Sequence, residues 1–235
     1  MINLFASSLI AVLCFFQTAH AQSSLLFSKP GPQSHAADIS EQVLIEAYQR
    51  IGIDITTLTF PGERALAMSN RGDVDGEVNR IKGLEVKYPN LVMVPVVINW
   101  LDGVVVTKRK DLKINGWESL RPYRVGYRIG LKFVEYGTSG MKVTAVPSDK
   151  SLFKMLDYGR VDMVVSTRID SRLMISEKQY SDMMVLEPPL VQLELFHYLH
   201  KKNKDLLLRI TQALQDMTDE GRIQAIRKAE TDKLY

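Results

Sequence analysis

Four cationic side chains lie close to glycines or prolines that predict turns, where a side chain could reach a small solute. They are Arg64, Arg80, Arg128 and Lys132. A guanidinium group has a planar set of N–H donors that can make two hydrogen bonds to one carboxylate, and an ammonium group binds anions as a point charge. These residue types suit an anionic or zwitterionic solute. The alternative for each is an ordinary solvated charge or a surface ion pair.

Other chemistries lack their motifs in this chain. The histidines at 35, 197 and 200 are scattered and do not have the spacing of metal ligands, so we expect no metal and no cofactor. We find neither a Gly-x-Ser-x-Gly motif nor a phosphate-binding loop. The net charge of +3, from 30 basic and 27 acidic residues, is spread along the chain. Without a basic stripe and interleaved aromatic residues, a nucleic-acid partner is not expected.

The N-terminus predicts export. Leu4 to Phe16 is apolar apart from two serines, and Ala19-His20-Ala21 has small residues where a signal peptidase reads the chain. We therefore expect residues 1–21 to be a signal peptide cleaved after Ala21, and the protein to be periplasmic. The apolar run is shorter than the roughly twenty residues that span a bilayer, so a retained anchor is the weaker alternative. Cys14, the single cysteine, lies in this segment, which leaves no thiol for a disulfide.

The rest of the chain alternates between strand-like and helix-like segments, which predicts an α/β fold with mostly parallel sheets. A helix is expected from Asp38, which forms a capping box with Glu41, to Gly52. Further helices are expected after Pro61, over 151–158, from an Asn203 cap, and over 219–229. Strands are expected at 25–28, 53–60, up to about Glu77, 91–97, 103–107, 123–127, 142–146, 161–166 and 191–199.

One short pattern occurs twice, as "GDVDGEVNR" from Gly72 and "GRVDMVVS" from Gly159. In both places we expect glycine to end a helix in the left-handed conformation and valine to enter a strand. The aspartates, Asp75 and Asp162, can bind free backbone amides at this joint, which is a structural role. Two such joints indicate two lobes of similar construction.

Two apolar runs, 91–97 and 103–107, lie midway along the chain with Trp100-Leu101-Asp102 between them. Two strands separated by so few residues predict a crossing point between the lobes. Trp100 could stack on a ligand there, or it could pack between the lobes.

Five segments in order resemble the periplasmic solute-binding proteins of family 3, the type II binding-protein fold known from amino-acid uptake by ABC transporters. These segments are "AYQRIGIDI" from Ala47, "PGERALAMSNRGDVDGEVNR" from Pro61, "WESLRPYRVGYRIG" from Trp117, "LFKMLDYGRVDMVV" from Leu152 and "KKNKDLLLRITQALQDMTDEGRIQAI" from Lys201. The resemblance implies two α/β lobes joined by a two-strand hinge. Lobe one would comprise 22–100 plus 191–235, and lobe two 101–190.

The resemblance also implies roles for single residues. Arg80 aligns with the arginine that binds the ligand carboxylate in amino-acid binders, and Glu77 lies near positions that are often threonine. Thr167 occupies the position of the aspartate that binds the ligand's amino group. Arg64 lies near a helix N-terminus that should face the cleft. Arg128 and Lys132 lie on either side of the loop of lobe two. Together, Arg80, Arg128 and Lys132 would give a cationic cleft.

The resulting hypothesis is a monomeric, non-enzymatic protein that closes around a small polar solute, amino-acid-like or an organic anion. Closure would stabilise a form that a membrane partner recognises. The partner would be a permease of ABC-type uptake or, alternatively, a membrane sensor. A third hypothesis is enzymatic, because the same fold hosts dehydratases of the cyclohexadienyl type. Glu77 could then be the general acid beside Arg80 if burial raised its pKa.

Overall fold

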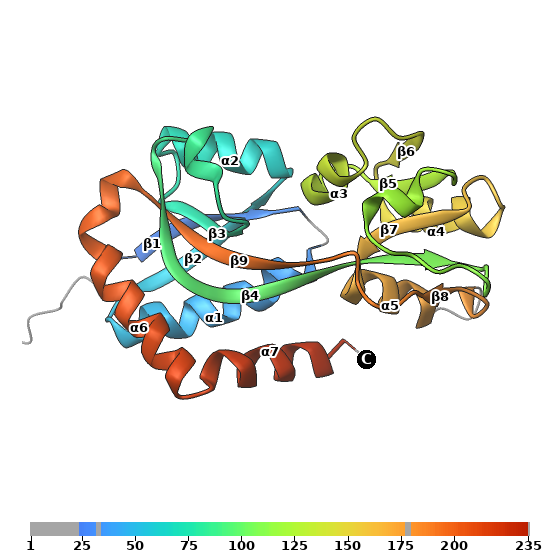
Figure 1. Cartoon of the computed structure of the whole chain (residues 1–235). Coiled ribbons are helices and arrows are strands. Elements are labelled where there is room, and N and C mark those ends of the chain that lie inside the picture. The colour runs from blue at the N-terminus through green and yellow to red at the C-terminus, as the bar shows by residue number, and fades with distance from the viewer. Residues whose placement is uncertain (1–23, 32–33, 177–179, 235) are drawn as a thin grey trace, which may run out of the picture.

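The structure is a computed structural model, and it describes residues 24–31, 34–176 and 180–234. The signal peptide predicted for residues 1–21 lies outside these residues. Two lobes are joined by two long strands, β4 and β9, that run side by side between them (Figure 1). The first lobe contains β1 (Ser24–Pro30), α1 (His35–Arg50), β2 (Asp54–Phe60), α2 (Gly62–Arg71), β3 (Gly76–Arg80), the short helix at Leu84–Val86, and the start of β4 (Leu91–Thr107).

The second lobe follows β4, and the chain then returns to the first lobe through β9. The second lobe contains a short helix at Trp117–Leu120, β5 (Val125–Arg128), α3 (Lys132–Gly137), β6 (Val143–Val146), α4 (Asp149–Asp157), β7 (Met163–Thr167), α5 (Arg168–Ser176) and β8 (Met184–Val185). The chain ends in β9 (Val191–His200), a short helix at Lys201–Leu206, α6 (Leu207–Asp219) and α7 (Arg222–Asp232).

The strands form one sheet in the order β2-β1-β3-β9-β4-β7-β5-β6, with β8 beside β4. Within the lobes, β1 is parallel to β2 and β3, and β5 is parallel to β6 and β7. The strands β4 and β9 pair antiparallel with each other. In addition, β9 pairs antiparallel with β3, and β4 pairs antiparallel with β7. The predicted two-lobed α/β fold with parallel strands and a two-strand hinge is confirmed.

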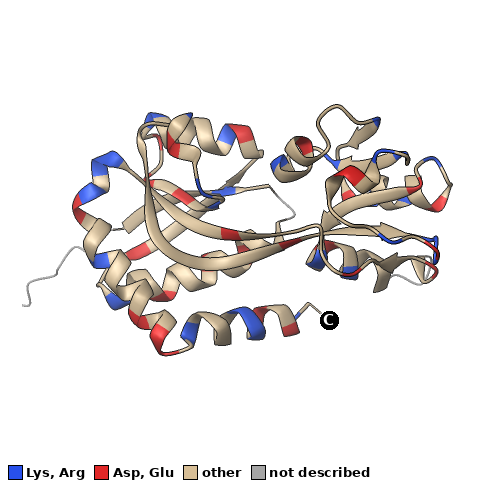
Figure 2. Cartoon of the chain, viewed as in Figure 1, with Lys and Arg blue, Asp and Glu red and all other residues tan. Residues whose placement is uncertain are grey.

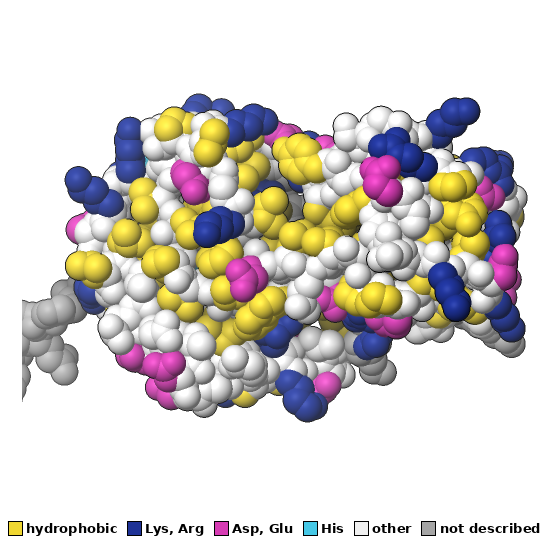
Figure 3. Space-filling model, in the orientation of Figure 1, with side chains coloured by type: hydrophobic (Ala, Val, Ile, Leu, Met, Phe, Trp, Pro, Cys, Tyr) yellow, Lys and Arg dark blue, Asp and Glu magenta, His cyan; other side chains and the backbone are white. Residues whose placement is uncertain are grey.

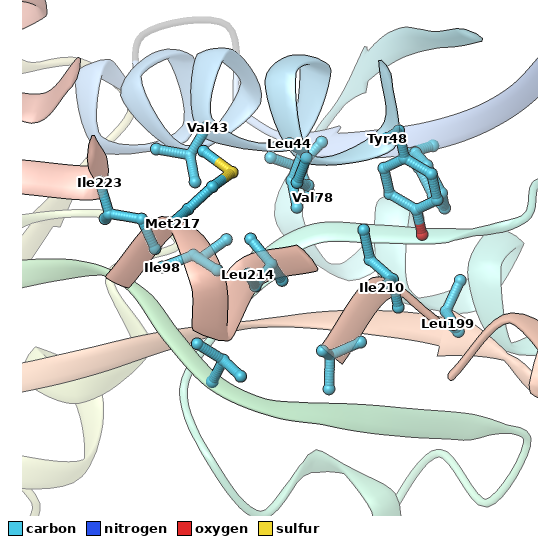
Figure 4. Close-up of a cluster of buried hydrophobic side chains, with 14 of the residues drawn as sticks. Val43, Leu44, Tyr48, Val78, Ile98, Leu199, Ile210, Leu214, Met217 and Ile223 are labelled. Carbon is cyan, nitrogen blue, oxygen red and sulfur yellow. The ribbon is translucent and has the colours of Figure 1, made fainter. Parts of the chain in front are cut away.

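Each lobe has its own hydrophobic core. The core of the first lobe includes Val43, Tyr48, Ile98 and Leu214, which come from α1, β4 and α6 (Figure 4). The clusters of the second lobe contain residues between Val105 and Leu190 and share no residue with the first. Burying such side chains contributes about 2 kcal/mol each, so each lobe can hold its shape while the other moves. The boundaries 22–100 plus 191–235 and 101–190 stay a prediction.

The glycines and aspartates of the repeated joints behave as expected, but the valines do not enter a strand, because β3 begins at Gly76, after Val74, and β7 begins at Met163, after Val161. Gly72 ends α2 with a φ of 84°, and Gly159 follows α4 with a φ of 64°. The Oδ2 atom of Asp75 accepts the backbone N–H of Leu26 at 2.8 Å, and Oδ2 of Asp162 accepts that of Arg124 at 2.8 Å. Asp75 therefore ties its loop to β1, and Asp162 ties its loop to the residue that directly precedes β5.

Two predicted strand boundaries near the hinge are wrong. The strand after the first joint begins at Gly76, where an added Cβ would lie 2.1 Å from the carbonyl oxygen of Tyr198, and it continues to Arg80. The segment from Leu91 to Thr107 is one strand of 17 residues, so Trp100 does not lie between two strands. The pairing of β4 with β9 shifts at two points before Asn99, and such bulges let a strand bend without breaking.

Two predicted helix caps are also wrong. Ser34, whose hydroxyl accepts the N–H of Ala37, caps α1, while Asp38 and Glu41 both contact the ammonium group of Lys29. Asn203 does not cap α6, because its amide donates a hydrogen bond to Asp75 at 2.9 Å. In the part of the chain that the structure describes, no helix has the length and apolar character to cross a membrane.

Candidate functional site

The carboxyl ends of the parallel strands in one lobe face those in the other. The strands β1, β2 and β3 end together because they are parallel, and α1 and α2 begin at this edge. The same holds for β5, β6 and β7 with α3, α4 and α5. The surface is hollowed between the lobes (Figure 3), and we call this space the interlobe cleft. Ligands of α/β proteins bind at such strand ends.

Arg80 ends β3 at this edge and is held by its own lobe. Its Nε donates to Oε2 of Glu77 at 2.9 Å, and Nη2 donates to the carbonyl oxygen of Gly62 at 2.9 Å. Its side chain keeps 14% exposure. No hydrogen-bond partner of Nη1 is found among the described residues. Arg80 is therefore fixed in place with one donor nitrogen available to a solute.

Glu77 lies behind Arg80 and is fully buried. Its other oxygen, Oε1, lies 2.7 Å from the hydroxyl of Ser28 and 3.3 Å from that of Ser69. Burial raises the pKa of the Glu77 carboxyl, against the lowering effect of the Arg80 charge. In this arrangement Glu77 positions Arg80, and its own oxygens do not reach the surface of the cleft.

Arg128 ends β5 on the opposite side. Its Nε forms an ion pair with Asp149 at 2.9 Å without hydrogen-bond geometry, and its Nη2 lies 3.7 Å from Asp170. Both carboxylates are buried, at 7% and 5% exposure, and burial raises the pKa of Asp149. The imidazole of His35, at the start of α1 in the other lobe, bonds Asp170 at 2.7 Å. This hydrogen bond raises the pKa of His35 and links the lobes.

Lys132 makes a second link between the lobes. Its ammonium group lies 3.1 Å from Glu63 of α2 and 2.7 Å from Glu135 of its own helix. The hydrogen bond from Lys132 lowers the pKa of Glu63. Arg64, in contrast, is exposed, and its guanidinium lies 5.4 Å from the centre of the Phe60 ring. Within the described ranges, no carboxylate lies within 4 Å of Arg64.

The cleft predicted to be cationic carries carboxylates as well, because Arg80, Arg128 and Lys132, the three cations expected to form it, are all paired with them. Both signs are interspersed over the two lobes (Figure 2). The cleft can therefore offer an anion-binding nitrogen of Arg80 on one side and buried carboxylates on the other.

Trp100 and Thr167, also predicted to bind the solute, line a separate pocket of about 450 Å³ beside the hinge strands. The guanidinium of Arg227 lies 4.4 Å above the Trp100 ring. The hydroxyl of Thr167 accepts the N–H of Asp170 at 3.1 Å and so stabilises the first turn of α5. The seven predicted residues thus fall into three groups, at the two strand edges and in this hinge pocket.

Sequence reasoning missed Asp149, Asp170 and the role of His35. One signal was present, because Thr167 and Asp170 have the spacing of a helix N-terminus, but we expected no helix there. For His35 there was no signal, since its partner lies 135 residues away. In the described part of the chain, no group of histidine, cysteine, aspartate and glutamate side chains is arranged to hold a metal ion.

Solved structures with this architecture are numerous. One is a histidine kinase sensor domain with similarity to periplasmic binding proteins, with a TM-score of 0.73, 14% identity, and 88% of this chain and 96% of that chain covered. The chain has the periplasmic binding protein fold. Another structure of this fold is an ancestral arginine-binding protein bound to glutamine, with a TM-score of 0.68 and 16% identity over 88% of this chain and 97% of the other. The resemblance that the sequence motifs indicated is confirmed at the level of the fold.

A third structure with this fold is the periplasmic VFT2 domain of BvgS from Bordetella pertussis. Its TM-score is 0.65, with 16% identity over 88% of this chain and 92% of that domain. No family model matches the chain, and no curated protein sequence matches it either. The fold is therefore shared with solute-binding and sensor proteins, while the sequence has diverged from them.

Proposed function

We propose that this protein is an exported, periplasmic binding protein that closes its two lobes around a small amino-acid-like solute. The observation that carries the proposal is the pair of facing strand edges, one ending in Arg80 and the other in Arg128. They are joined by two antiparallel strands and bridged by the His35–Asp170 and Lys132–Glu63 contacts. Hinged strands with few contacts between lobes allow opening, and a solute that contacts both edges would favour closure.

The charges at the two edges favour a zwitterion over a simple anion. A solute carboxylate would bind Nη1 of Arg80, which is free of hydrogen bonds among the described residues, and Glu77 would hold this guanidinium in position. A solute ammonium group would approach the carboxylates of Asp149 and Asp170 beside Arg128. An organic anion without an amino group is the second candidate, with Lys132 released from the exposed Glu63 to bind it.

The test is calorimetry with amino acids and with organic acids, using Arg80→Lys beside the unaltered protein. Lysine keeps a positive charge near the buried Glu77 but loses the planar set of donors, so binding of the solute should weaken about tenfold or more. A matched control is Arg71→Lys on α2, whose exposed side chain pairs with Asp73. Equal binding by both variants, or no binding of any tested compound together with no compaction in X-ray scattering, would contradict the proposal.

The enzymatic hypothesis has less support from this geometry. A general acid must come within hydrogen-bond distance of its substrate, and the Glu77 carboxyl has no exposed surface and is engaged by Arg80, Ser28 and Ser69. The unaltered protein should therefore show no dehydratase activity, and Glu77→Gln should not change this result. A measurable turnover of prephenate or arogenate by the unaltered protein would overturn this conclusion.

We infer that the protein is a monomer and that a membrane protein recognises and binds its closed form. Solved structures of the same fold include an amino acid ABC transporter's substrate-binding protein and a histidine kinase sensor domain, which are the two partner classes we propose. A permease is the first proposal and a sensor is the second. Loss of solute accumulation in cells lacking this protein indicates uptake, whereas unchanged accumulation with altered gene expression indicates sensing.

A further inference from the structure

The hinge pocket has walls from both lobes. Arg227 and Gln224 of α7 come from the first lobe, Arg168 and Arg172 of α5 come from the second, and Trp100 of β4 lies at the crossing. In Figure 1, α7 lies below β4 and β9, whereas α2 and α3 lie above them. The residues that line this pocket do not include Arg64, Arg80, Arg128 or Lys132. Its volume of about 450 Å³ is within the usual range for small-molecule sites.

Arg227 is held in place by an amide and an aromatic ring. Its Nε donates to the side-chain oxygen of Asn99 at 2.8 Å, and its guanidinium is stacked on Trp100. Asn99 is itself fixed, because its amide donates to the carbonyl oxygen of Ala36. Across the described chain, no carboxylate lies within 4 Å of Arg227, and its two terminal nitrogens have no hydrogen-bond partner. The Arg227 side chain is half-buried, and burial lowers its pKa against the raising effect of the Asp102 charge.

The two other arginines of the pocket, Arg168 and Arg172, differ in whether a carboxylate neutralises them. Arg168 is neutralised by Asp102 at 2.8 Å and by Glu187, and Gln192 donates to the other oxygen of Asp102. Arg172 follows one turn after Arg168 on α5, and none of the described carboxylates lies within 4 Å of it. Two guanidinium groups, one from each lobe, therefore line the same space without an ion pair within 4 Å among the described residues, while Glu187 acts on Arg172 and Asp102 on Arg227 from farther away. Each could make two hydrogen bonds to one carboxylate.

We propose that the hinge pocket is a second binding site, distinct from the interlobe cleft, for a small di- or tricarboxylate held by Arg227 and Arg172. The carbon chain of such a ligand would lie against Trp100, Leu101 and Ile169, which give the pocket its apolar part. Gln192 and Gln224 can donate further hydrogen bonds. Because the two arginines belong to different lobes, the ligand favours the lobe arrangement in which both can reach it. This coupling rests on the hinge motion of the proposed function, but the binding itself does not.

The experiment uses Trp100 as its reporter. The chain has two tryptophans, so Trp117→Phe leaves Trp100 as the single indole, directly beneath the Arg227 guanidinium. Citrate and succinate are titrated up to about 10 mM, a concentration that detects millimolar affinity, while tryptophan emission is recorded. We expect a saturable change in emission. No saturable change with either acid, confirmed by calorimetry on the unaltered protein, would overturn the proposal.

Variants locate the site. Arg227→Gln should weaken citrate or succinate binding about tenfold or more, while Lys228→Gln, which removes one exposed charge from the same helix, should leave it unchanged. Arg172→Gln gives the same loss as Arg227→Gln without touching the Asn99 and Trp100 contacts, so it stays informative if Arg227→Gln fails to fold. Arg80→Lys distinguishes the two sites, because it weakens any binding of the acid in the interlobe cleft and leaves the binding that depends on Arg172 and Arg227. Binding that is lost in Arg80→Lys and kept in Arg172→Gln would place the anion in the interlobe cleft and refute a second site.

Discussion

Each lobe ends a central strand in an arginine at the cleft, but the two arginines are held in different ways. Arg80 is paired with Glu77, three residues earlier in the same strand, so its position is set within one lobe. Arg128, at the end of β5, faces one carboxylate from α4 and one from α5. The carboxylate from α5, Asp170, also binds His35 of the opposite lobe. We conclude that the first arginine is preorganised for a solute, whereas the surroundings of the second depend on how the lobes are placed.

The strongest test of this difference is Arg80→Gln, which leaves the buried Glu77 without its cation. Breaking such a buried pair should lower the free energy of unfolding by about 3 kcal/mol, measured by urea denaturation. Burial raises the pKa of Glu77, so its ionised form costs stability as the pH rises through the folded-state pKa. The loss should therefore be larger at about pH 8 than at about pH 5, because protonation of the carboxyl reduces its need for a cation as the pH falls.

The double variant Glu77→Gln/Arg80→Gln is the control, since it removes both charges. It should recover much of the stability that Arg80→Gln loses. If Arg80→Gln alone were as stable as the unaltered protein at both pH values, Glu77 would not hold Arg80, and the contrast between the lobes would fail.

A smaller effect is expected from Asp170→Asn, which tests the dependence of Arg128 on the other lobe. Asparagine keeps the shape of the side chain but removes the charge that faces both His35 and Arg128, so the contact between α1 and α5 should weaken. The free energy of unfolding should fall by roughly 1–2 kcal/mol, and the radius of gyration in X-ray scattering should rise. The matched control is Asp157→Asn, since Asp157 pairs with Lys108 inside the second lobe. A radius that changes equally in both variants would contradict a link through Asp170.

The smallest expected effect comes from pH. Because bonding to Asp170 raises the folded-state pKa of His35, the link contributes fully below the unfolded pKa, near 6.5, and is lost as the pH rises through the folded-state value. Raising the pH from about 6 to about 8 should therefore loosen the lobes, by less than about 1 kcal/mol because His35 is partly exposed. Scattering across this range tests it, with His35→Gln expected to show a flat profile. A pH profile of His35→Gln identical to that of the unaltered protein would contradict a role of His35 in linking the lobes.

The fold could be predicted from the sequence to a large extent, because its signals are local. Gly72 and Gly159 mark helix ends, and the Val-Asp pairs after them mark the joints to the sheet, as the structure confirms. The errors arose where local signals compete with distant partners. Asp38 looked like a cap but contacts Lys29, and Asn203 looked like a cap but contacts Asp75.

The candidate site was predicted less completely. Arg80, Arg128 and Lys132 do lie at the facing edges, yet their carboxylate partners come mostly from other elements and were not foreseen. Glu135 lies three residues after Lys132 in the same helix, and the one partner that was foreseen is Glu77, three residues before Arg80 in the same strand. Its complete burial depends on Ser28 and Ser69 of neighbouring elements, which no local pattern indicates.

The sequence by itself determined the alternation of strands and helices, the two matching joints and the cations that follow the strands, because each depends on residues close together in the chain. Only the tertiary structure decided which charges meet across the lobes and that Trp100 and Thr167 share a pocket with Arg227. The physical reason is that an ion pair or a pocket needs surfaces brought together by the whole sheet and its hinge. His35 and Asp170, 135 residues apart, meet only because β4 and β9 carry the chain between the lobes and back.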